Sequence, residues 1–299
     1  MNSTALVFPG QGSQFVGMGK NIYQQFPEIH SWFKLADDVL GFKISDICFD
    51  GPELELNKTS ITQPAILLIS KVFFEIFKKH QWNFEAVSGH SLGIYSALVV
   101  AEAIKFEDAL LLVQFRGQLM QEAGGQGKMA VILQLDIEKI KAVCQIASSV
   151  GVVEPANVNC PGQIVIAGES KALEMACQEA KKMGAKRVLE LPVSGPFHSS
   201  LMKSAVLPFW DRLKKVSFST PIKKVYSDTT GLILSSSDKI VENLAQQLTT
   251  PVQWINVIQE MVQDGYTKFV EVGPGKVLTG LIKKINAQVE TINFNDMNS

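Results

Sequence analysis

The chain has 299 residues, and its 28 basic and 29 acidic side chains give a formal net charge of -1. A composition that is 46% hydrophobic and 19% charged is typical of a globular protein with a full core, and it excludes a disordered, collagen-like or coiled-coil chain. The near-neutral charge excludes a protein whose overall field attracts nucleic acid or an anionic membrane. The length predicts roughly two domains, or one large domain with an insertion.

The N-terminal residues and the cysteines indicate the cellular compartment in which the protein is expected. Residues 1–8 contain no basic region and no apolar run of signal-peptide length, and runs such as 65–69 and 97–101 are too short to span a bilayer. We therefore expect a cytosolic protein. The four cysteines lie far apart without a C-x-x-C pair, so the sequence predicts reduced thiols, with neither a zinc site nor a redox dithiol.

Short strand-like runs alternate with longer helical patterns, which predicts an α/β fold. The first strand is expected at 5–8. A helix follows at about 62–80, with Pro64 in its first turn, where a missing N–H costs nothing. A second strand, 85–88, leads directly into a glycine-flanked turn and an apolar helical stretch, 94–103.

The pattern changes in the middle of the chain. The predicted elements there are a strand at 129–135, a helix capped by Asp136, strands at 152–158 and 163–167, a helix capped by Ser170, and a strand at 186–191. The order β-α-β-β-α-β is that of a ferredoxin-like unit. Glycine-rich residues 124–127 precede it and Gly195-Pro196 follow it. We therefore predict an insertion, 128–192, in a large domain made of 1–127 and 193–299.

After the insertion the α/β alternation resumes. The expected elements are a helix from 201, a strand near 225, a helix at 253–264, a strand at 267–272 and a helix from 276.

Gly89-His90-Ser91-Leu92-Gly93 matches the pattern G-x-S-x-G, with a predicted strand before it and a predicted helix after it. A turn this sharp requires glycine on both sides, because a β-carbon there would collide with the neighbouring backbone. Ser91 is therefore the candidate nucleophile, and the N–H of Leu92 points to where an oxyanion would form. The alternative is a glycine-rich turn with a capping serine.

A serine nucleophile needs a base, and the chain has four histidines. His30 and His80 suit solvent-exposed or helix-end positions, and His90 adjoins the serine on a turn where neighbouring side chains diverge. His198 remains, in the loop that leaves the insertion, where a cleft between domains is expected. The alternative is a merely structural histidine.

The sequence offers no obvious acid for a triad. The only aspartates between the serine and the histidine, Asp108 and Asp136, are better explained as helix-start residues. A Ser–His dyad whose imidazole is held by a backbone carbonyl is therefore expected.

The loop Phe8-Pro9-Gly10-Gln11-Gly12-Ser13-Gln14 lacks the third glycine of G-x-G-x-x-G and the Gly-Lys-Ser/Thr of a P-loop, which makes it a poor nucleotide site. Serine enzymes of this architecture draw a second oxyanion N–H from a loop after the first strand, and Gln11 would be that donor. An ordinary turn is the alternative.

Arg116, one of three arginines, lies on a predicted helix whose face is otherwise apolar. A guanidinium on such a face is costly unless it meets an anion. That anion is either an internal acid, such as Glu102 or Glu107, or a carboxylate of the substrate held by two parallel N–H bonds.

Together these motifs resemble the malonyl-CoA:acyl carrier protein transacylases over residues 8 to about 285. The matching segments are 8–14, 89–93, Arg116-Gly117, Asn159-Cys160-Pro161-Gly162-Gln163, Gly195-Pro196-Phe197-His198-Ser199, Pro251-Val252-Gln253-Trp254 and Glu271-Val272-Gly273-Pro274-Gly275. The resemblance implies a hydrolase-like α/β core with a parallel sheet and an inserted ferredoxin-like subdomain.

The resemblance also implies roles for particular residues. Ser91 and His198 look like the nucleophile and the general base, Gln11 and Leu92 like the oxyanion donors, and the carbonyl of Gln247 like the acceptor that holds the histidine. Arg116 looks like the clamp on the malonyl carboxylate, and Phe197, Asn159 and His90 look like further substrate-side residues.

Two positions depart from the family pattern. Ile94 stands where an acidic residue usually follows the nucleophile turn, and Pro196 stands where alanine is common. Neither change removes a group that the chemistry needs.

The resemblance implies transfer of malonyl from malonyl-CoA to the phosphopantetheine thiol of acyl carrier protein through a malonyl-serine ester, for fatty acid or polyketide synthesis. We expect no metal or redox cofactor and a monomer. Because carrier proteins of such pathways are acidic, Lys181, Lys182, Lys186 and Arg187, or Lys283 and Lys284, are candidates for a docking rim. The alternatives are a serine thioesterase that uses the same turn, and a catalytically silent acyl-binding module.

Overall fold

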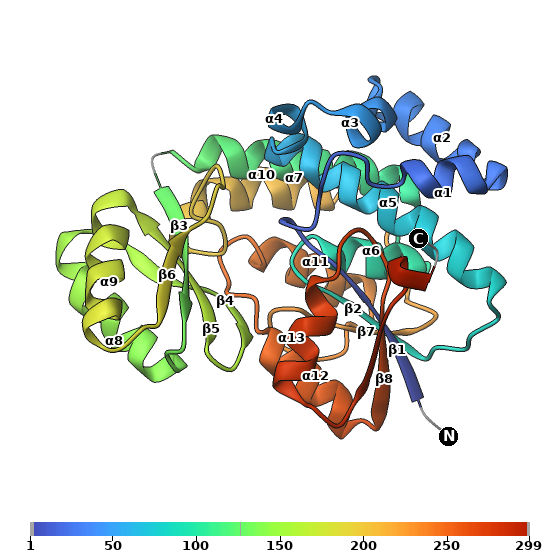
Figure 1. Cartoon of the computed structure of the whole chain (residues 1–299). Coiled ribbons are helices and arrows are strands. Elements are labelled where there is room, and N and C mark those ends of the chain that lie inside the picture. The colour runs from blue at the N-terminus through green and yellow to red at the C-terminus, as the bar shows by residue number, and fades with distance from the viewer. Residues whose placement is uncertain (1–2, 126, 298–299) are drawn as a thin grey trace.

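The computed structural model describes residues 3–125 and 127–297, in which the strands form two sheets (Figure 1). Gln126, part of the predicted glycine-rich connection, lies outside the described residues, as do 1–2 and 298–299. The larger sheet is parallel, in the order β7-β2-β1-β8-β9. Its strands are β1 (Ser3–Phe8), β2 (Ala86–Gly89), β7 (Lys224–Tyr226), β8 (Tyr266–Glu271) and β9 (Glu290–Asn293).

The two faces of the parallel sheet are covered by different helices, because side chains alternate along each strand. On β1, Leu6 and Phe8 belong to a core with α5 (Thr59–Lys79), α6 (Gly93–Val100), α7 (Phe106–Ala123), α10 (Lys203–Leu213) and α11 (Ser237–Gln246). Ala5 and Val7 belong to a second core with α12 (Trp254–Gln263) and α13 (Val277–Ile285). The remaining helices of the N-terminal third are α1 (Lys20–Gln25), α2 (His30–Leu40), α3 (Ile44–Asp50) and α4 (Glu53–Leu56).

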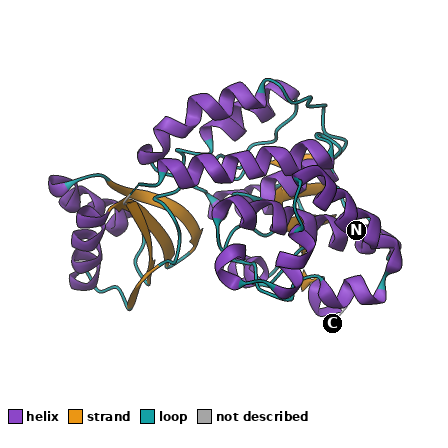
Figure 2. Cartoon of the chain, turned by 90° about the horizontal axis from the view of Figure 1, so that it is seen from above, coloured by secondary structure: helices purple, strands orange, loops and turns teal. Residues whose placement is uncertain are grey.

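The second sheet is antiparallel, in the order β4-β5-β3-β6. Its elements follow one another as β3 (Gly127–Leu133), α8 (Ile137–Ala147), β4 (Val153–Cys160), β5 (Gln163–Glu169), α9 (Ser170–Lys182) and β6 (Arg187–Glu190). Figure 2 shows this sheet at one side of the body, with its helices on the side away from the body. The two sheets confirm the expected fold, a parallel α/β body with an antiparallel, ferredoxin-like subdomain. The exact limits of the insertion, 128–192, stay a prediction.

The two faces of the antiparallel sheet also pack differently. On β5, Ile164 and Ile166 pack in a core with α8 and α9. The alternating residues Val165 and Ala167 face the other way and belong to the core of the body. The subdomain therefore shares its inner face with the body.

Two local predictions are wrong, and one is confirmed. Helix α5 begins at Thr59, so Pro64 lies inside the helix and not in its first turn. Helix α9 begins at Ser170, which puts Glu169, and not the serine, at the N-cap position. Asp136 does cap α8, because its side chain accepts from the N–H of Lys139 at 2.8 Å.

Helix α5 is the one described helix that is long and apolar enough to cross a membrane by length and composition. Of its most apolar 18-residue window, 78% is buried inside the structure. Its apolar character is therefore that of a core helix.

Candidate active site

Ser91 sits on a sharp turn between β2 and α6 with a φ of 51°, in the left-handed region that an L-residue rarely adopts. A β-carbon on Gly89 would lie 1.9 Å from the carbonyl carbon of Gly93, and one on Gly93 would lie 2.0 Å from the carbonyl oxygen of Phe8. Both glycines are therefore required by the turn, which lifts the serine above the carboxyl edge of the parallel sheet.

His198 faces Ser91 across a hydrogen-bond distance, with 2.8 Å between its Nε2 and the serine Oγ. Its Nδ1 lies 2.8 Å from the backbone carbonyl oxygen of Gln247, which fixes the Nδ1–H tautomer. The imidazole is 3% exposed, and burial together with the positive charge of Arg116 lowers its pKa to about 3. The histidine is therefore neutral at physiological pH, with Nε2 free to accept a proton.

Two backbone N–H groups near Ser91 remain open for a ligand. Within the described residues, neither the N–H of Gln11 nor that of Leu92 donates to a protein acceptor. Leu92 is the N-cap residue of α6, and Gln11 lies in the loop after β1. An unpaired N–H is the requirement for stabilising an oxyanion.

Arg116 comes from α7 and is 1% exposed. Its Nη1 donates to Gln63 Oε1 at 3.0 Å, and its Nη2 donates to Gln247 Oε1 at 3.0 Å and to Ser91 Oγ at 3.3 Å. In the part of the chain that the structure describes, Arg116 forms no ion pair with an acidic side chain.

The internal ion pair that the sequence left open for Arg116 is therefore wrong. Glu102 and Glu107 are both exposed, whereas the guanidinium is buried beside the serine. Burial also lowers the pKa of Arg116, because the charged form has lost its water. The hydrogen-bond partners of this cation among the described residues are two amides and a hydroxyl, and its guanidinium carbon lies over the ring of Tyr95, 5.6 Å from the centroid. Because none of these partners is an anion, the guanidinium has the capacity to bind one next to Ser91.

The sequence did not identify Asp228 or Gln63. Asp228 is fully buried, and its Oδ2 accepts from the N–H of Ser91 at 3.1 Å and from Nε2 of Gln247 at 2.7 Å. Asp228 lies two residues after the end of β7, the strand that pairs with β2. That position is a signal in the sequence, since the carboxyl ends of parallel strands meet at one edge of a sheet. Asp228 lies after His198 in the chain, outside the segment between the serine and the histidine in which a hydrolase-type order places the acid.

The other substrate-side candidates are in two places: His90 and Asn159 contact each other beside the nucleophile, and Phe197 is packed in the core of the body. His90 Nε2 lies 2.8 Å from Oδ1 of Asn159, so the subdomain strand β4 contacts the residue next to the nucleophile. The His90 ring also packs edge-on against Trp254 at 5.6 Å. Phe197 is 4% exposed and belongs to the core of the body.

A cavity of about 330 Å³ lies between the loop that follows β1 (residues 9–14), the subdomain and α13. Its lining includes Gln11, His90, Asn159, Gln163, Leu191 and Val277. A second cavity, of about 560 Å³, includes His198 together with Lys203, Thr249 and Pro251. The site is therefore bordered by hollows on the Gln11 side and on the His198 side.

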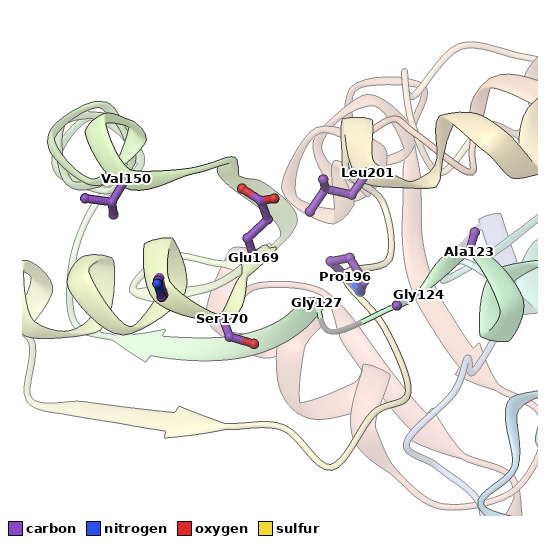
Figure 3. A pocket seen from close by; sticks show the side chains of 10 residues that line it. Ala123, Gly124, Gly127, Val150, Glu169, Ser170, Pro196 and Leu201 are labelled. Carbon is purple, nitrogen blue, oxygen red and sulfur yellow. The ribbon is translucent and has the colours of Figure 1, made fainter.

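A third cavity, of about 370 Å³, lies where the connections between body and subdomain pass each other (Figure 3). Gly124, Gly127 and Pro196 line it on the connections, and Glu169 and Ser170 line it on the subdomain. It contains none of the candidate catalytic residues.

Among the described residues, no group of three or more His, Cys, Asp and Glu side chains is arranged to hold a metal ion. The four cysteines are free thiols, as the sequence predicts. The polar groups gathered at Ser91 are those of acyl transfer by a hydroxyl nucleophile.

Comparison with known proteins gives one consistent result. Residues 5–295 match the family model described as the acyl transferase domain. The chain is 44% identical to the malonyl CoA-acyl carrier protein transacylase of Bacillus subtilis, with 99% of this chain and 94% of that protein covered. It is 42% identical to the transacylase of the same name from Haemophilus influenzae, with 100% and 97% covered.

Solved structures agree with the sequence comparison. An acyl carrier protein S-malonyltransferase from Vibrio cholerae matches with a TM-score of 0.94 at 41% identity, over 97% of this chain and 96% of that chain. A malonyl-transacylase in complex with its type II PKS acyl-carrier protein matches with a TM-score of 0.95 at 41% identity, over 97% and 95%.

Proposed function

Because this chain belongs to the family of acyl transferase domains, we propose that it moves a malonyl group from malonyl-CoA to the phosphopantetheine thiol of an acyl carrier protein. The observation that carries the proposal is the buried Arg116, which makes no direct contact with an acidic side chain among the described residues and has its Nη2 3.3 Å from the hydroxyl of Ser91. The relatives at 44% and 42% identity are named for this activity. The product would supply extender units for fatty acid or polyketide synthesis.

In the first step Ser91 Oγ attacks the thioester carbonyl while His198 Nε2 accepts the hydroxyl proton. The N–H groups of Gln11 and Leu92 stabilise the oxyanion, and each such donor is worth about 3 kcal/mol. The C–O bond to the serine forms, the C–S bond to coenzyme A breaks, and the proton passes from His198 to the leaving sulfur. A malonyl-serine ester and free coenzyme A result.

In the second step the carrier thiol gives its proton to His198 and attacks the ester. The C–S bond forms, the C–O bond to Ser91 breaks, and His198 returns the proton to the serine oxygen. Both steps use the same acid–base group, so no metal or redox cofactor enters this proposal.

The carboxylate of the malonyl group would bind Arg116, and it would also change the basicity of His198. Arg116 and His198 both reach the Oγ of Ser91, and the guanidinium disfavours a positive imidazole. When the malonyl carboxylate pairs with Arg116, it offsets that charge and makes His198 a stronger base. A neutral acyl group lacks this effect, which favours malonyl over acetyl.

A serine thioesterase is the competing activity. It would use Ser91, His198 and the same oxyanion donors, but hydrolysis of a neutral acyl thioester does not require a buried cation such as Arg116 to bind the acyl group. The names of the relatives favour transfer over hydrolysis.

The carrier protein is the proposed macromolecular partner, since a structural relative is described in complex with an acyl-carrier protein. An acidic carrier protein would be attracted by exposed basic side chains of this chain. Such side chains lie on the subdomain at Lys181, Lys182, Lys186 and Arg187, and on α13 at Lys283 and Lys284. We also propose a cytoplasmic monomer.

The test is to incubate the protein with radiolabelled malonyl-CoA, to map the label by peptide mass spectrometry, and then to add holo carrier protein. Transfer predicts label on Ser91 that moves to the carrier. Release of the label to water would instead indicate a thioesterase, and absence of label would indicate a silent binding module. Ser91→Ala is the control that must remain unlabelled.

A further inference from the structure

Asp228 is a buried carboxylate that the proposed mechanism does not use. It follows β7 at the carboxyl edge of the parallel sheet and is fully buried. One oxygen, Oδ2, accepts from the N–H of Ser91 and from the side-chain amide of Gln247. The other oxygen, Oδ1, is buried without a partner among the described residues. An ion in this position needs a compensating charge.

Gln247 connects this carboxylate to Arg116. Its Nε2 donates to Asp228 Oδ2 at 2.7 Å and to the carbonyl oxygen of Ser91 at 2.9 Å. Its Oε1 accepts from Arg116 Nη2 at 3.0 Å. Because both amide hydrogens face acceptors and the amide oxygen faces a donor, the orientation of the Gln247 side chain is fixed. Arg116 and Asp228 are therefore opposite charges joined through one amide.

The amide of Gln247 keeps Asp228 from pairing directly with Arg116, and this matters for the binding of a substrate carboxylate. A carboxylate directly on the guanidinium would occupy the donors that a malonyl carboxylate requires, and binding would have to break that pair. At one amide's distance the guanidinium donates only to neutral acceptors, and its Nε has no partner among the described residues. The opposite charge still offsets the buried cation, since Coulomb energy falls only as the inverse of distance.

We propose that Asp228 is the counter-ion of Arg116, positioned through Gln247, and that its charge sets how strongly the site binds an anionic acyl group. This inference rests on the proposed malonyl transfer and adds a specificity-determining residue to it. With Asp228 ionised, the pair is neutral before substrate binds; with Asp228 neutral, the site presents an uncompensated cation.

The neighbours of Asp228 let its titration be assigned. Burial raises the pKa of Asp228 to about 6, opposed by the hydrogen bond from Gln247 and by Arg116. The ionisable groups that face it are Arg116 from α7, Tyr95 from α6 and, across Gln247, His198. Burial raises the pKa of Tyr95 and lowers the pKa of His198 to about 3.

His90, beside Ser91, also has a pKa lowered by burial, so it too is neutral near pH 7. Asp228 is then the group in this cluster whose charge changes as pH falls through about 6. A fall in pH removes its negative charge and leaves the positive charge of Arg116.

Opposite effects on binding and rate follow. When Asp228 gains its proton, malonyl-CoA should bind more tightly, by about five- to tenfold for one charge at this separation. The maximal rate of serine acylation should fall, because loss of the negative charge of Asp228 removes one of the charges that stabilise a protonated His198 and so makes the histidine a weaker base. If Asp228 had only a structural role, its neutralisation would weaken binding and lower the rate together. It would also change the affinities for anionic and neutral acyl groups by the same factor.

The experiment measures single-turnover acylation of Ser91 by malonyl-CoA in a rapid-quench instrument, with acetyl-CoA as a competing neutral ligand. For the wild type, the half-saturating malonyl-CoA concentration, divided by the inhibition constant of acetyl-CoA, should fall about five- to tenfold between about pH 7.5 and pH 5.5. For Asp228→Asn this ratio should already be low at pH 7.5 and should no longer change with pH.

Glu271→Gln is the matched control. Glu271 is also fully buried at the end of a parallel strand, and burial raises its pKa, but it accepts from the N–H groups of Leu278 and Thr279 in α13. Its neutralisation should leave the wild-type pH dependence of the ratio intact.

A wild-type ratio that is constant with pH, or an Asp228→Asn variant that keeps the wild-type ratio and its pH dependence, would overturn the inference. If Asp228→Asn does not fold, the wild-type pH series decides alone. If the wild type forms no malonyl ester on Ser91, the proposed function fails, and the counter-ion role fails with it. Acylation with an unchanged ratio sinks only the counter-ion role.

Discussion

The parallel-sheet body and the antiparallel subdomain contribute to the site in different ways. The body supplies Ser91, His198, Arg116 and Gln247, all buried and joined by hydrogen bonds. The subdomain supplies Asn159, through one hydrogen bond to His90, and part of the wall of the cavity beside Gln11. Under the proposed function, the body would therefore perform the chemistry and the subdomain would shape the approach to Ser91.

The two regions are nevertheless joined close to the site. Val252 forms a bridge to β4, donating to the carbonyl oxygen of Ala156 at 2.9 Å and accepting from the N–H of Val158 at 2.8 Å. Val252 lies five residues after Gln247, whose carbonyl oxygen holds His198. The different contributions of body and subdomain should therefore appear in rates and affinities, and variants in both regions test this.

The largest effect is expected in the body, for Arg116→Ala. Loss of the carboxylate clamp should lower the efficiency of malonyl transfer by about 3 kcal/mol, or roughly a hundredfold, while transfer of neutral acetyl is retained or rises. Rates of both transfers, measured from acyl-CoA to carrier protein, check this expectation.

Arg116→Lys is the matched variant, because it keeps the charge and loses the planar fork. It should recover only part of the malonyl activity. Equal losses of malonyl and acetyl transfer in Arg116→Ala would reduce the arginine to a structural role.

A smaller effect is expected in the subdomain, for Asn159→Ala. The variant loses the contact to His90, which is worth about 1 kcal/mol, or roughly fivefold, and the loss should appear in the KM for malonyl-CoA more than in kcat. Steady-state kinetics at several malonyl-CoA concentrations separate the two. A hundredfold fall in kcat would show that the subdomain takes part in the chemistry itself.

The smallest effect is expected on the outer surface of the subdomain. Lys181→Glu with Lys186→Glu should raise the KM for carrier protein roughly threefold at low salt and less at high salt, because exposed charges are screened. The rate of serine acylation by malonyl-CoA should not change. The matched pair Lys283→Glu with Lys284→Glu, on α13, tests the other candidate rim; an effect only there would move the docking surface to the body.

Local patterns in the sequence predicted much of the fold. The strand–turn–helix around Ser91 and the β-α-β-β-α-β order of the subdomain both depend on short-range signals, glycine positions and side-chain periodicity. The N-cap of α9 and the place of Pro64 in α5 were wrong, because the helices begin one and three residues earlier than the strongest local signals suggest.

The charge network of the site was harder to predict. Asp228 lies 137 positions from Ser91, and only the parallel pairing of β7 with β2 brings the two together. Gln63 reaches Arg116 from a different helix, and an amide on an apolar helix carries no distinctive signal.

The most direct measurement of the central claim is the intact mass of the protein after brief exposure to malonyl-CoA, followed by a chase with holo carrier protein. Transfer predicts one added malonyl group, located on Ser91, that leaves the protein and appears on the carrier thiol. A malonyl group that disappears as free malonate at the same rate with and without carrier, or one attached elsewhere than Ser91, would contradict the account.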